Sequence, residues 1–340
     1  RQRQLCIRDS LYDGRLYVEP TLTQSLAYLR KRIANSIGGL KHRLDHRLGR
    51  RPLMWQLALG KGPIDTAALW RTKPIEPPAD RFWADPFLIE KDGRLFCFFE
   101  EYDYPSHRAW ISVGVIDGDR FDYLGRAIDT GYHMSFPVVI AHGDEIFLIP
   151  ETGARKCIEI WRATDFPLAW ERHTTVFEGV SVADTVLLAH AGRWWMFANI
   201  ASGIEPDFCN ELHVFMVDGP ELREITPHPG NPVVVDAHTA RNAGRPFIRD
   251  GRIFRPSQVN NFGIYGYGLN LMEITELTPT SFAQRDAHQA RPKFHPGIIA
   301  THHFDALGDT FVIDICRKVG GRGHWRAGAV APVPGQSPET

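Results

Sequence analysis

The chain has 340 residues, of which 43% are hydrophobic and 11% aromatic, including nine Trp and twenty Phe. This is enough apolar material for a sizeable core, and the aromatic content favours strands over helices. The net charge is −1, but residues 1–51 contain twelve Lys or Arg against four Asp or Glu, so the remainder carries −9. An acidic body of this kind argues against nucleic acid as a partner.

The five cysteines are odd in number and widely scattered, and the sequence has no Cys-x-x-Cys spacing. We therefore expect reduced thiols and neither a disulfide framework nor a cysteine-based metal site. The sequence also lacks an apolar run of about 18 residues, the length of a membrane-spanning helix. These features favour a cytoplasmic location and leave association with a membrane surface open.

Residues 1–53 form a basic N-terminal extension in this interpretation. Thr21 and Gln24 are spaced as a capping box and predict the start of a helix that continues to about Leu48. Apolar residues recur in it every three or four positions and form one stripe, consisting of Leu26, Leu29, Ile33, Ile37, Leu40, Leu44 and Leu48. Residues 24–48 either pack this stripe on the protein itself or on a partner, or lie on an anionic membrane surface.

The segment from Phe82 to Glu101 predicts a strand, a tight turn at Asp92-Gly93 and a return strand with acidic ends. The same unit recurs four more times, beginning near Ser135, Val182, Gly244 and Thr301. Successive strand entrances lie 47 to 61 residues apart; in this alignment they are Asp85, Pro137, Asp184, Arg245 and His303.

A repeat of about fifty residues suits the four-stranded blade of a β-propeller. A β-sandwich would not repeat a whole strand-turn-strand unit five times with aligned polar ends. We therefore predict an all-β, five-bladed β-propeller over residues 54–325. It follows the helical, basic extension and precedes a flexible tail at 326–340.

Residues at the same place in each copy are expected to share one space, because the innermost strands of a propeller surround its axis. Strand entrances and the ends of return strands lie at one mouth, since the two strands are antiparallel. Polar residues at these places are predicted to contact substrate: Glu100, Asn199, Arg245, Gln258, His302 and His303. A stacking wall for a sugar is predicted from four aromatic residues: Phe82, Trp83, Tyr132 and Phe136. Because neighbouring residues of a strand alternate in direction, only one of the two adjacent histidines should point inward.

Asp85, Glu151 and Asp184 are the candidate catalytic residues. Paired carboxylates suit glycosyl transfer, because an ionised one acts as base or nucleophile while a protonated one serves the leaving oxygen. Burial and neighbouring negative charge should raise one pKa, while Arg245 should keep another carboxylate ionised. The plainer alternatives are an Asx turn at Asp85, a loop carboxylate at Glu151 and a simple salt bridge at Arg245.

Seven motifs occur in a characteristic order: Ala84-Asp85-Pro86-Phe87, Ser135-Phe136-Pro137, Ile149-Pro150-Glu151, Val182-Ala183-Asp184, Gly244-Arg245-Pro246, Arg255-Pro256-Ser257-Gln258 and Thr301-His302-His303. Over about residues 54–316 this order resembles the N-terminal propeller domain of plant glucosamine inositolphosphorylceramide transferases and its bacterial relatives. The chain is more distantly similar to family 43 glycoside hydrolases. That resemblance implies Asp85 as general base, Glu151 or Asp184 as acid or pKa modulator, and His303 close to a central ion.

We therefore expect a carbohydrate-active enzyme that makes or breaks a glycosidic bond in a surface or storage glycan, with a carbohydrate or glycoconjugate as its partner. No cofactor or metal is expected, apart from such an ion near His303. The resemblance also implies that transferase chemistry belongs to a separate downstream domain of the plant proteins. A non-catalytic, glycan-binding or scaffold propeller is therefore the alternative.

Overall fold

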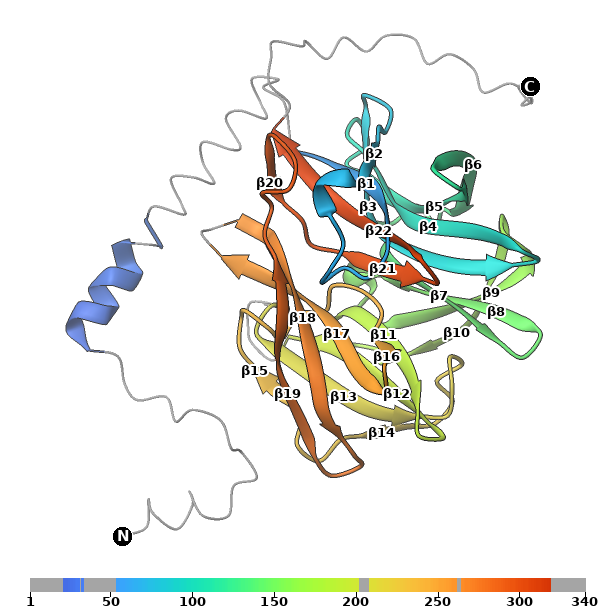
Figure 1. The fold of residues 1–340 in the computed structure, drawn as a ribbon. Coiled ribbons are helices and arrows are strands. Elements are labelled where there is room, and N and C mark those ends of the chain that lie inside the picture. The colour runs from blue at the N-terminus through green and yellow to red at the C-terminus, as the bar shows by residue number, and fades with distance from the viewer. Residues whose placement is uncertain (1–20, 31, 34–52, 202–207, 262–263, 319–340) are drawn as a thin grey trace. The chain divides into compact units, whose positions relative to one another are not determined.

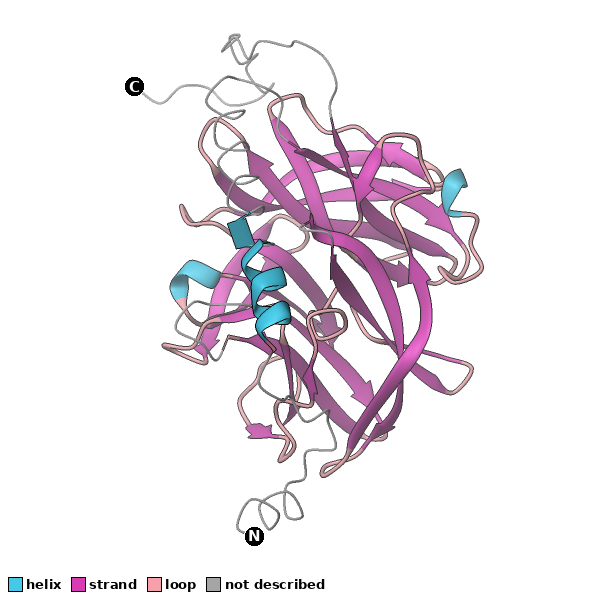
Figure 2. Cartoon of the chain, turned by 90° about the vertical axis from the view of Figure 1, so that its left-hand side faces the viewer, coloured by secondary structure: helices cyan, strands magenta, loops and turns pink. Residues whose placement is uncertain are grey.

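The computed structural model describes residues 21–30, 32–33, 53–201, 208–261 and 264–318. Strands dominate this part of the chain (Figure 2). They lie in one compact unit, and the helix over residues 22–33 belongs to a second.

The predicted capping box is present at the start of this helix. The backbone N–H of Thr21 donates to Gln24 Oε1 at 2.8 Å, and the N–H of Gln24 lies 3.4 Å from Thr21 Oγ1. Residues 34–48 of the predicted helix lie outside the described residues. Among the described helices, none combines the length and the apolarity needed to cross a membrane.

Five antiparallel sheets make up the propeller unit (Figure 1). The first contains β3 (Arg81–Lys91), β4 (Arg94–Asp103), β5 (Arg108–Asp117) and β6 (Arg120–Ile128). The second contains β7 (Ser135–His142), β8 (Glu145–Glu151), β9 (Ile158–Asp165) and β10 (Ala169–Val176). The third contains β11 (Val182–His190), β12 (Arg193–Ile200), β13 (Glu211–Val217) and β14 (Ile225–Pro227), with β15 (Val234–Val235) also paired to β13. The fourth contains β16 (Phe247–Arg249), β17 (Arg252–Asn261), β18 (Ile264–Leu277) and β19 (Phe282–Ala290).

The fifth sheet closes the ring with strands from opposite parts of the sequence. Its order is β2 (Lys73–Ile75), β1 (Leu53–Lys61), β22 (Thr310–Lys318) and β20 (Ile298–Ala300), with β21 (Phe304–Leu307) also paired to β22. Two short 3-10 turns, η1 (Leu69–Arg71) and η2 (Gly153–Arg155), lie between strands. The prediction of a five-bladed propeller is confirmed. The sequence pattern did not reveal that β1 and β2 complete the last blade.

One outer strand contains a proline. Pro74 lies in β2 and is paired with Ala58 of β1. An edge strand such as β2 can contain a proline, because no further strand needs a hydrogen bond from the missing N–H.

The hairpin turns occur where the Gly-containing dipeptides predict them. Asp92 and Gly93 have φ angles of 52° and 70°, and Asp250 and Gly251 have 51° and 72°. Two consecutive residues with positive φ give the turn twist that matches paired strands. These turns set the register of β3 with β4 and of β16 with β17.

The hydrophobic core lies between neighbouring blades. Inner strands such as β3 are buried on both faces, whereas the outer strand β6 is largely exposed. Between the first and second blades, Phe98 of β4 packs edge-on against Trp170 of β10, with ring centroids 5.6 Å apart. Cys97, Cys157 and Cys316 are buried and form no disulfide.

Arg245 connects the innermost strands of three blades. Its guanidinium donates to the carbonyl oxygens of Leu88 in β3 and Val139 in β7, at 3.1 and 3.0 Å. It also lies 3.4 Å from the carboxylate of Asp305 in β21, which accepts the N–H of Leu88 at 2.7 Å. Burial raises the pKa of Asp305 to about 6, although Arg245 opposes this shift.

We predict that Arg245→Leu lowers the free energy of unfolding by roughly 3 kcal/mol at about pH 7, because it leaves a buried carboxylate unpaired. The folded state binds the Asp305 proton more tightly than the unfolded state does. Its contribution to stability is therefore complete below the unfolded pKa and is lost as pH rises through about 6. Without Arg245 the pKa of Asp305 rises further, so the substitution should destabilise the protein less at about pH 5 than at about pH 7. Urea unfolding at both pH values measures the free energy of unfolding of the two proteins.

The exposed Arg94→Leu is the matched control and should leave the unfolding midpoint almost unchanged. An equal loss of stability for Arg245→Leu at both pH values would contradict the charge-pairing explanation. The hydrogen bonds to the two carbonyl oxygens would then carry the effect.

Candidate functional site

A repeated β-bulge brings the first strands of three blades into equivalent positions. Ala84 pairs with Glu100, Ser135 with Glu151 and Ala183 with Asn199, and in each blade the register then shifts. The residues that begin the bulges have left-handed backbones, with φ angles of 51° at Asp85, 49° at Phe136 and 47° at Asp184. A bulge with this conformation changes the direction in which its side chain points.

This geometry corrects the alignment of the copies. Phe136, and not Pro137, occupies the place of Asp85, because the bulge residue precedes the proline. Shortly before β16 of the fourth blade, Gly244 has a positive φ of 138°. A Cβ on Gly244 would lie 1.8 Å from the carbonyl oxygen of Phe304, so only glycine fits there.

Asp314 of β22 is the buried centre of the site. Its Oδ1 accepts the backbone N–H groups of His302 and His303 at 2.8 and 2.9 Å. Its Oδ2 lies 2.5 Å from Nδ1 of His302 and accepts the N–H of Asp85 at 3.4 Å. Burial raises the pKa of Asp314, but the charge and hydrogen bonds of His302 outweigh it and hold the pKa below its usual value.

The two adjacent histidines both reach Asp85, contrary to the expectation that only one would point inward. Nε2 of His302 and Nδ1 of His303 lie 3.7 and 3.6 Å from Asp85 Oδ1. The physical reason is that residues 301–303 are not part of a strand and do not alternate. Asp314 instead bends this segment through the hydrogen bonds to its N–H groups.

The histidines differ in charge because their surroundings differ. Burial lowers the pKa of His302, but the Asp314 carboxylate outweighs it and raises the pKa to about 9. The imidazolium stacks on Trp55 of β1, with ring centroids 4.1 Å apart. Burial lowers the pKa of His303 to about 3, and its ring lies edge-on to Phe87 and Phe136 at 4.6 and 5.0 Å. At neutral pH His302 is therefore cationic and His303 neutral.

Asp85 itself is 7% exposed, and its pKa lies well above the usual value. Burial is the main cause, and the negative charges of Glu100, Asp314 and Asp184 add to it, while His302 opposes it. These mutual effects show that the carboxylates from different blades lie within electrostatic reach of one another.

A second group contains Glu151, Asp184 and Arg241. Arg241 Nε lies 2.5 Å from Asp184 Oδ2, and the N–H of Asp184 lies 3.4 Å from Glu151 Oε2. Burial, and next the charge of Asp184, raise the pKa of Glu151 well above its usual value, while Arg241 lowers it. The Arg241 guanidinium also covers the ring of Tyr265 at 5.0 Å, and this ring lies edge-on to His302 at 5.4 Å. Tyr265 therefore connects the two groups.

Glu100 lies at the edge of this cluster, 3.3 Å from Nε2 of His133. Burial lowers the pKa of His133, but the hydrogen bond and charge of Glu100 raise it overall. Two residues farther along β4, Tyr102 stacks on Phe82 with ring centroids 4.6 Å apart. Side chains two apart on a strand share a face, so an aromatic rim adjoins Glu100.

Four residues predicted to contact substrate have partners within the protein. Trp83 is 5% exposed, donates to Glu101 at 3.3 Å and packs in the core on Phe99. Asn199 is fully buried, accepts the N–H of Asn242 and donates to two backbone carbonyls.

Gln258 is 1% exposed, and its backbone N–H donates to the carbonyl of Arg241. Arg245, as described above, contacts backbone carbonyls and Asp305. Phe136, by contrast, lies against His303 at the site, but it is 1% exposed and its ring is edge-on to the imidazole.

Three charged or titratable residues of the site were not singled out from the sequence, in addition to the aromatic Trp55 and Tyr265. Asp314 had a detectable signal, because an acid within the apolar strand Phe311–Cys316 must be paired when it is buried. Arg241 and His133 lie shortly before the fourth and second copies of the repeat, outside the aligned positions. Nothing in the pattern marks either of them.

Asp85, His302 and Asp314 are the described residues that come closest to a metal-binding set, with ligand atoms within 4.8 Å of one another. Within this set an ion pair is formed, because Nδ1 of His302 lies 2.5 Å from Asp314 Oδ2 and the carboxylate raises the pKa of His302 to about 9. A cation would have to displace the His302 proton before this ring could bind it. The ring of His303 is buried between two phenylalanine rings.

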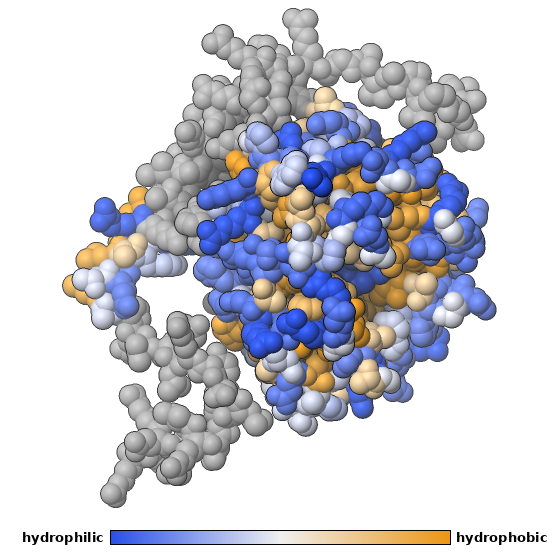
Figure 3. All heavy atoms as spheres, viewed as in Figure 1, coloured by the Kyte–Doolittle hydropathy of each residue, from blue (hydrophilic) through white to orange (hydrophobic). Residues whose placement is uncertain are grey.

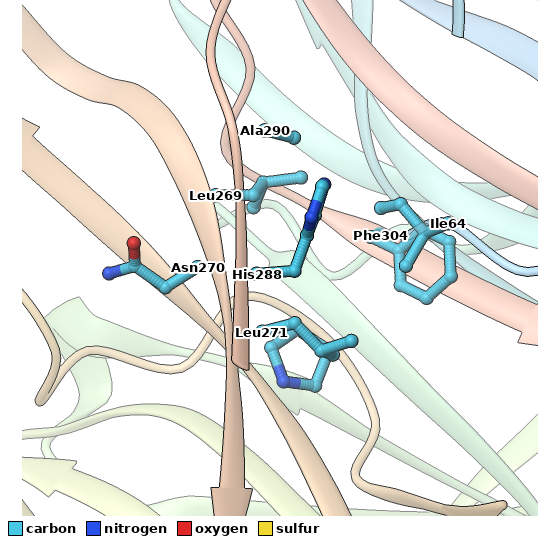
Figure 4. A pocket seen from close by; sticks show the side chains of 8 residues that line it. Ile64, Leu269, Asn270, Leu271, His288, Ala290 and Phe304 are labelled. Atoms are coloured by element: carbon cyan, nitrogen blue, oxygen red, sulfur yellow. The ribbon is translucent and has the colours of Figure 1, made fainter. Parts of the chain in front are cut away.

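A small cavity lies elsewhere, next to β18 and β19 (Figure 4). Its volume is about 10 Å³, the room of one water molecule. Its lining is mostly apolar and includes Ile64, Leu269, Leu271 and Phe304. It contains none of the carboxylates described above and is too small for a sugar.

Comparison with known proteins identifies a family and several relatives of this chain. Residues 63–296 match the family described as "Glucosamine inositolphosphorylceramide transferase 1, N-terminal". A glucosamine inositolphosphorylceramide transferase 1 from Oryza sativa subsp. japonica is 32% identical over 238 residues, which cover 66% of this chain and 31% of that protein. The protein of the same name from Arabidopsis thaliana is 26% identical over 268 residues, covering 72% and 35%. The chain thus spans about a third of the length of these curated relatives.

Among solved structures, the α-L-arabinofuranosidase from Lactobacillus brevis superposes with a TM-score of 0.52. The identity is 12%, and the superposition covers 73% of this chain and 88% of the other. This similarity is one of fold.

We predict that Asp314→Asn lowers the pKa of His302 from about 9 to its ordinary value of 6.5 or below, because burial is then unopposed. In the native protein the ion pair stabilises the fold below the unfolded pKa of histidine. That stability is lost as pH rises through about 9. Titration of the histidine Cε1–H resonances by NMR measures the pKa of His302 in both proteins.

Asp119→Asn, at an exposed carboxylate, is the control and should leave the His302 titration unchanged. His303, with a pKa of about 3, should stay neutral throughout and serves as an internal reference. The same titration curve for His302 in Asp314→Asn and in the native protein would exclude Asp314 as the cause.

Proposed function

We propose, starting from the fact that this chain belongs to the glucosamine inositolphosphorylceramide transferase 1 N-terminal family, that its propeller binds a sugar of a glycoconjugate and acts on a glycosidic bond. The observation that carries the proposal is the convergence of Asp85, Glu151 and Asp184 from three blades. Burial and mutual repulsion raise the pKa of both Asp85 and Glu151. Carboxyl groups with such shifts are suited to proton transfer near neutral pH.

The contacts suggest a division of roles. Glu151, whose pKa is raised by burial and next by the charge of Asp184, would donate a proton to the leaving glycosidic oxygen. Asp85, whose charged form is favoured by nearby cationic His302, would accept a proton from water or from an acceptor hydroxyl. Its raised pKa makes it a stronger base than a solvated carboxylate. Asp184, held by Arg241, would keep its place and modulate the pKa of Glu151.

A binding function without catalysis is the second candidate. It is favoured by the close ion pair between Arg241 and Asp184, which occupies one of the three carboxylates. It is also favoured by the span of the chain, which is about a third of its curated relatives. In this case the carboxylates would accept hydrogen bonds from sugar hydroxyls, and the Phe82 and Tyr102 rim would contact a sugar face.

We predict that Asp85→Asn and Glu151→Gln each lower turnover by about a hundredfold or more, because each removes a proton-transfer group. The measurement is a rate assay of the full chain on a panel of aryl glycosides and nucleotide sugars, with binding followed by calorimetry. Asp119→Asn, an exposed carboxylate, should retain the native rate. Unchanged turnover in both site variants would remove the two residues from catalysis. Binding by the native protein without turnover on any substrate would establish the second candidate.

A further inference from the structure

The helix over residues 22–33 has a narrow, exposed apolar stripe along one side. Leu22, Leu26, Leu29 and Ile33 recur at intervals of three and four. At 100° per residue they fall within a sector of about 60° on the helix surface. Their exposed fractions are 77%, 51%, 53% and 53%. Figure 3 shows hydrophobic, orange atoms beside hydrophilic ones on this helix.

Basic residues border the stripe on both sides. On the same helical projection, Arg30 and Arg32 lie about 80° to either side of the stripe centre. Residues 21–33 contain three Lys or Arg and no Asp or Glu. Long basic side chains beside an apolar stripe can place their aliphatic stems along apolar material while the charges remain in water.

We propose that this helix docks on the surface of an anionic lipid bilayer. Its apolar stripe enters the boundary between headgroups and acyl chains, and Arg30 and Arg32 contact phosphate and carboxylate groups of the lipids. Charge complementarity selects this occupant: the helix is wholly basic among its charged residues, whereas residues 52–340 carry −9. An anionic surface therefore attracts the helix and repels the acidic remainder. We expect the contact at the N-terminal helix and not on the propeller.

A lipid surface also explains the order of residues better than a protein groove does. The stripe consists of four residues, and a basic residue borders it on each side. Helices that lie in the plane of a membrane interface have this arrangement. The same helix of a second copy would offer Arg30 and Arg32 no acidic partner, because residues 21–33 contain no Asp or Glu.

The experiment is cosedimentation of the full 340-residue chain with vesicles of phosphatidylcholine and phosphatidylserine at about two to one. We expect the protein to pellet with these vesicles and to stay in the supernatant with phosphatidylcholine alone. The double variant Leu26→Asp, Leu29→Asp should abolish pelleting, because it places charges in the apolar stripe. Arg30→Glu with Arg32→Glu should weaken binding by roughly thirtyfold or more, and about 1 M salt should reduce native binding.

Two control variants match these changes on the propeller. Ile248→Asp alters an apolar side chain that is 48% exposed, and Arg94→Glu with Arg120→Glu reproduces the charge change at exposed positions. Both should pellet like the native chain. Circular dichroism and the unfolding midpoint, unchanged in all four variants, separate loss of docking from loss of folding.

Three outcomes would overturn the proposal. The native chain could remain in the supernatant with anionic vesicles. The Leu26 and Leu29 variant could bind as well as the native chain. Sedimentation velocity could show that the same variant converts a native dimer to a monomer, which would identify a second copy as the occupant of the stripe.

Discussion

The architecture of the site depends on one buried carboxylate. Asp314 holds the N–H groups of both histidines and pairs with the ring of His302. A carboxylate in the interior is costly unless its oxygens are satisfied. The chain meets this requirement by bending residues 301–303 out of strand geometry, and the bend directs both rings at Asp85. The need to satisfy one charge thus positions the neighbouring functional groups.

The same principle extends across the ring. Cations and anions alternate among the inner strands: His302 lies between Asp314 and Asp85, and Arg241 pairs with Asp184. Glu151 has no cation within ion-pair distance among the described residues, and burial raises its pKa well above the usual value. The pKa of Asp314, which pairs with His302, is held below its usual value instead. Shifts in opposite directions are the basis for assigning carboxyl groups of similar type different roles.

The sequence predicted the fold because each blade repeats a strand, a Gly-containing turn and a strand. The convergence of carboxyl groups was also predictable, since Asp85 and Asp184 occupy the same place in their repeats. Other features depend on contacts that no local pattern encodes. Trp83 lies two residues before Asp85 but is buried in the core, and Arg245 donates to backbone carbonyls that are distant in sequence. Arg241, in the connection that precedes β16, pairs with Asp184 of the third blade, another contact between distant parts of the sequence.

Closure of the ring has a consequence for ligand binding. β1 pairs with β22 in the last blade, and it brings Trp55 onto the ring of His302, while β22 supplies Asp314. The group of Trp55, His302 and Asp314 is therefore assembled only when β1 is paired with β22. Separation of these two strands would take the group apart, so a ligand bound there would bind the closed ring preferentially. Its binding free energy would then add to the free energy needed to separate β1 from β22.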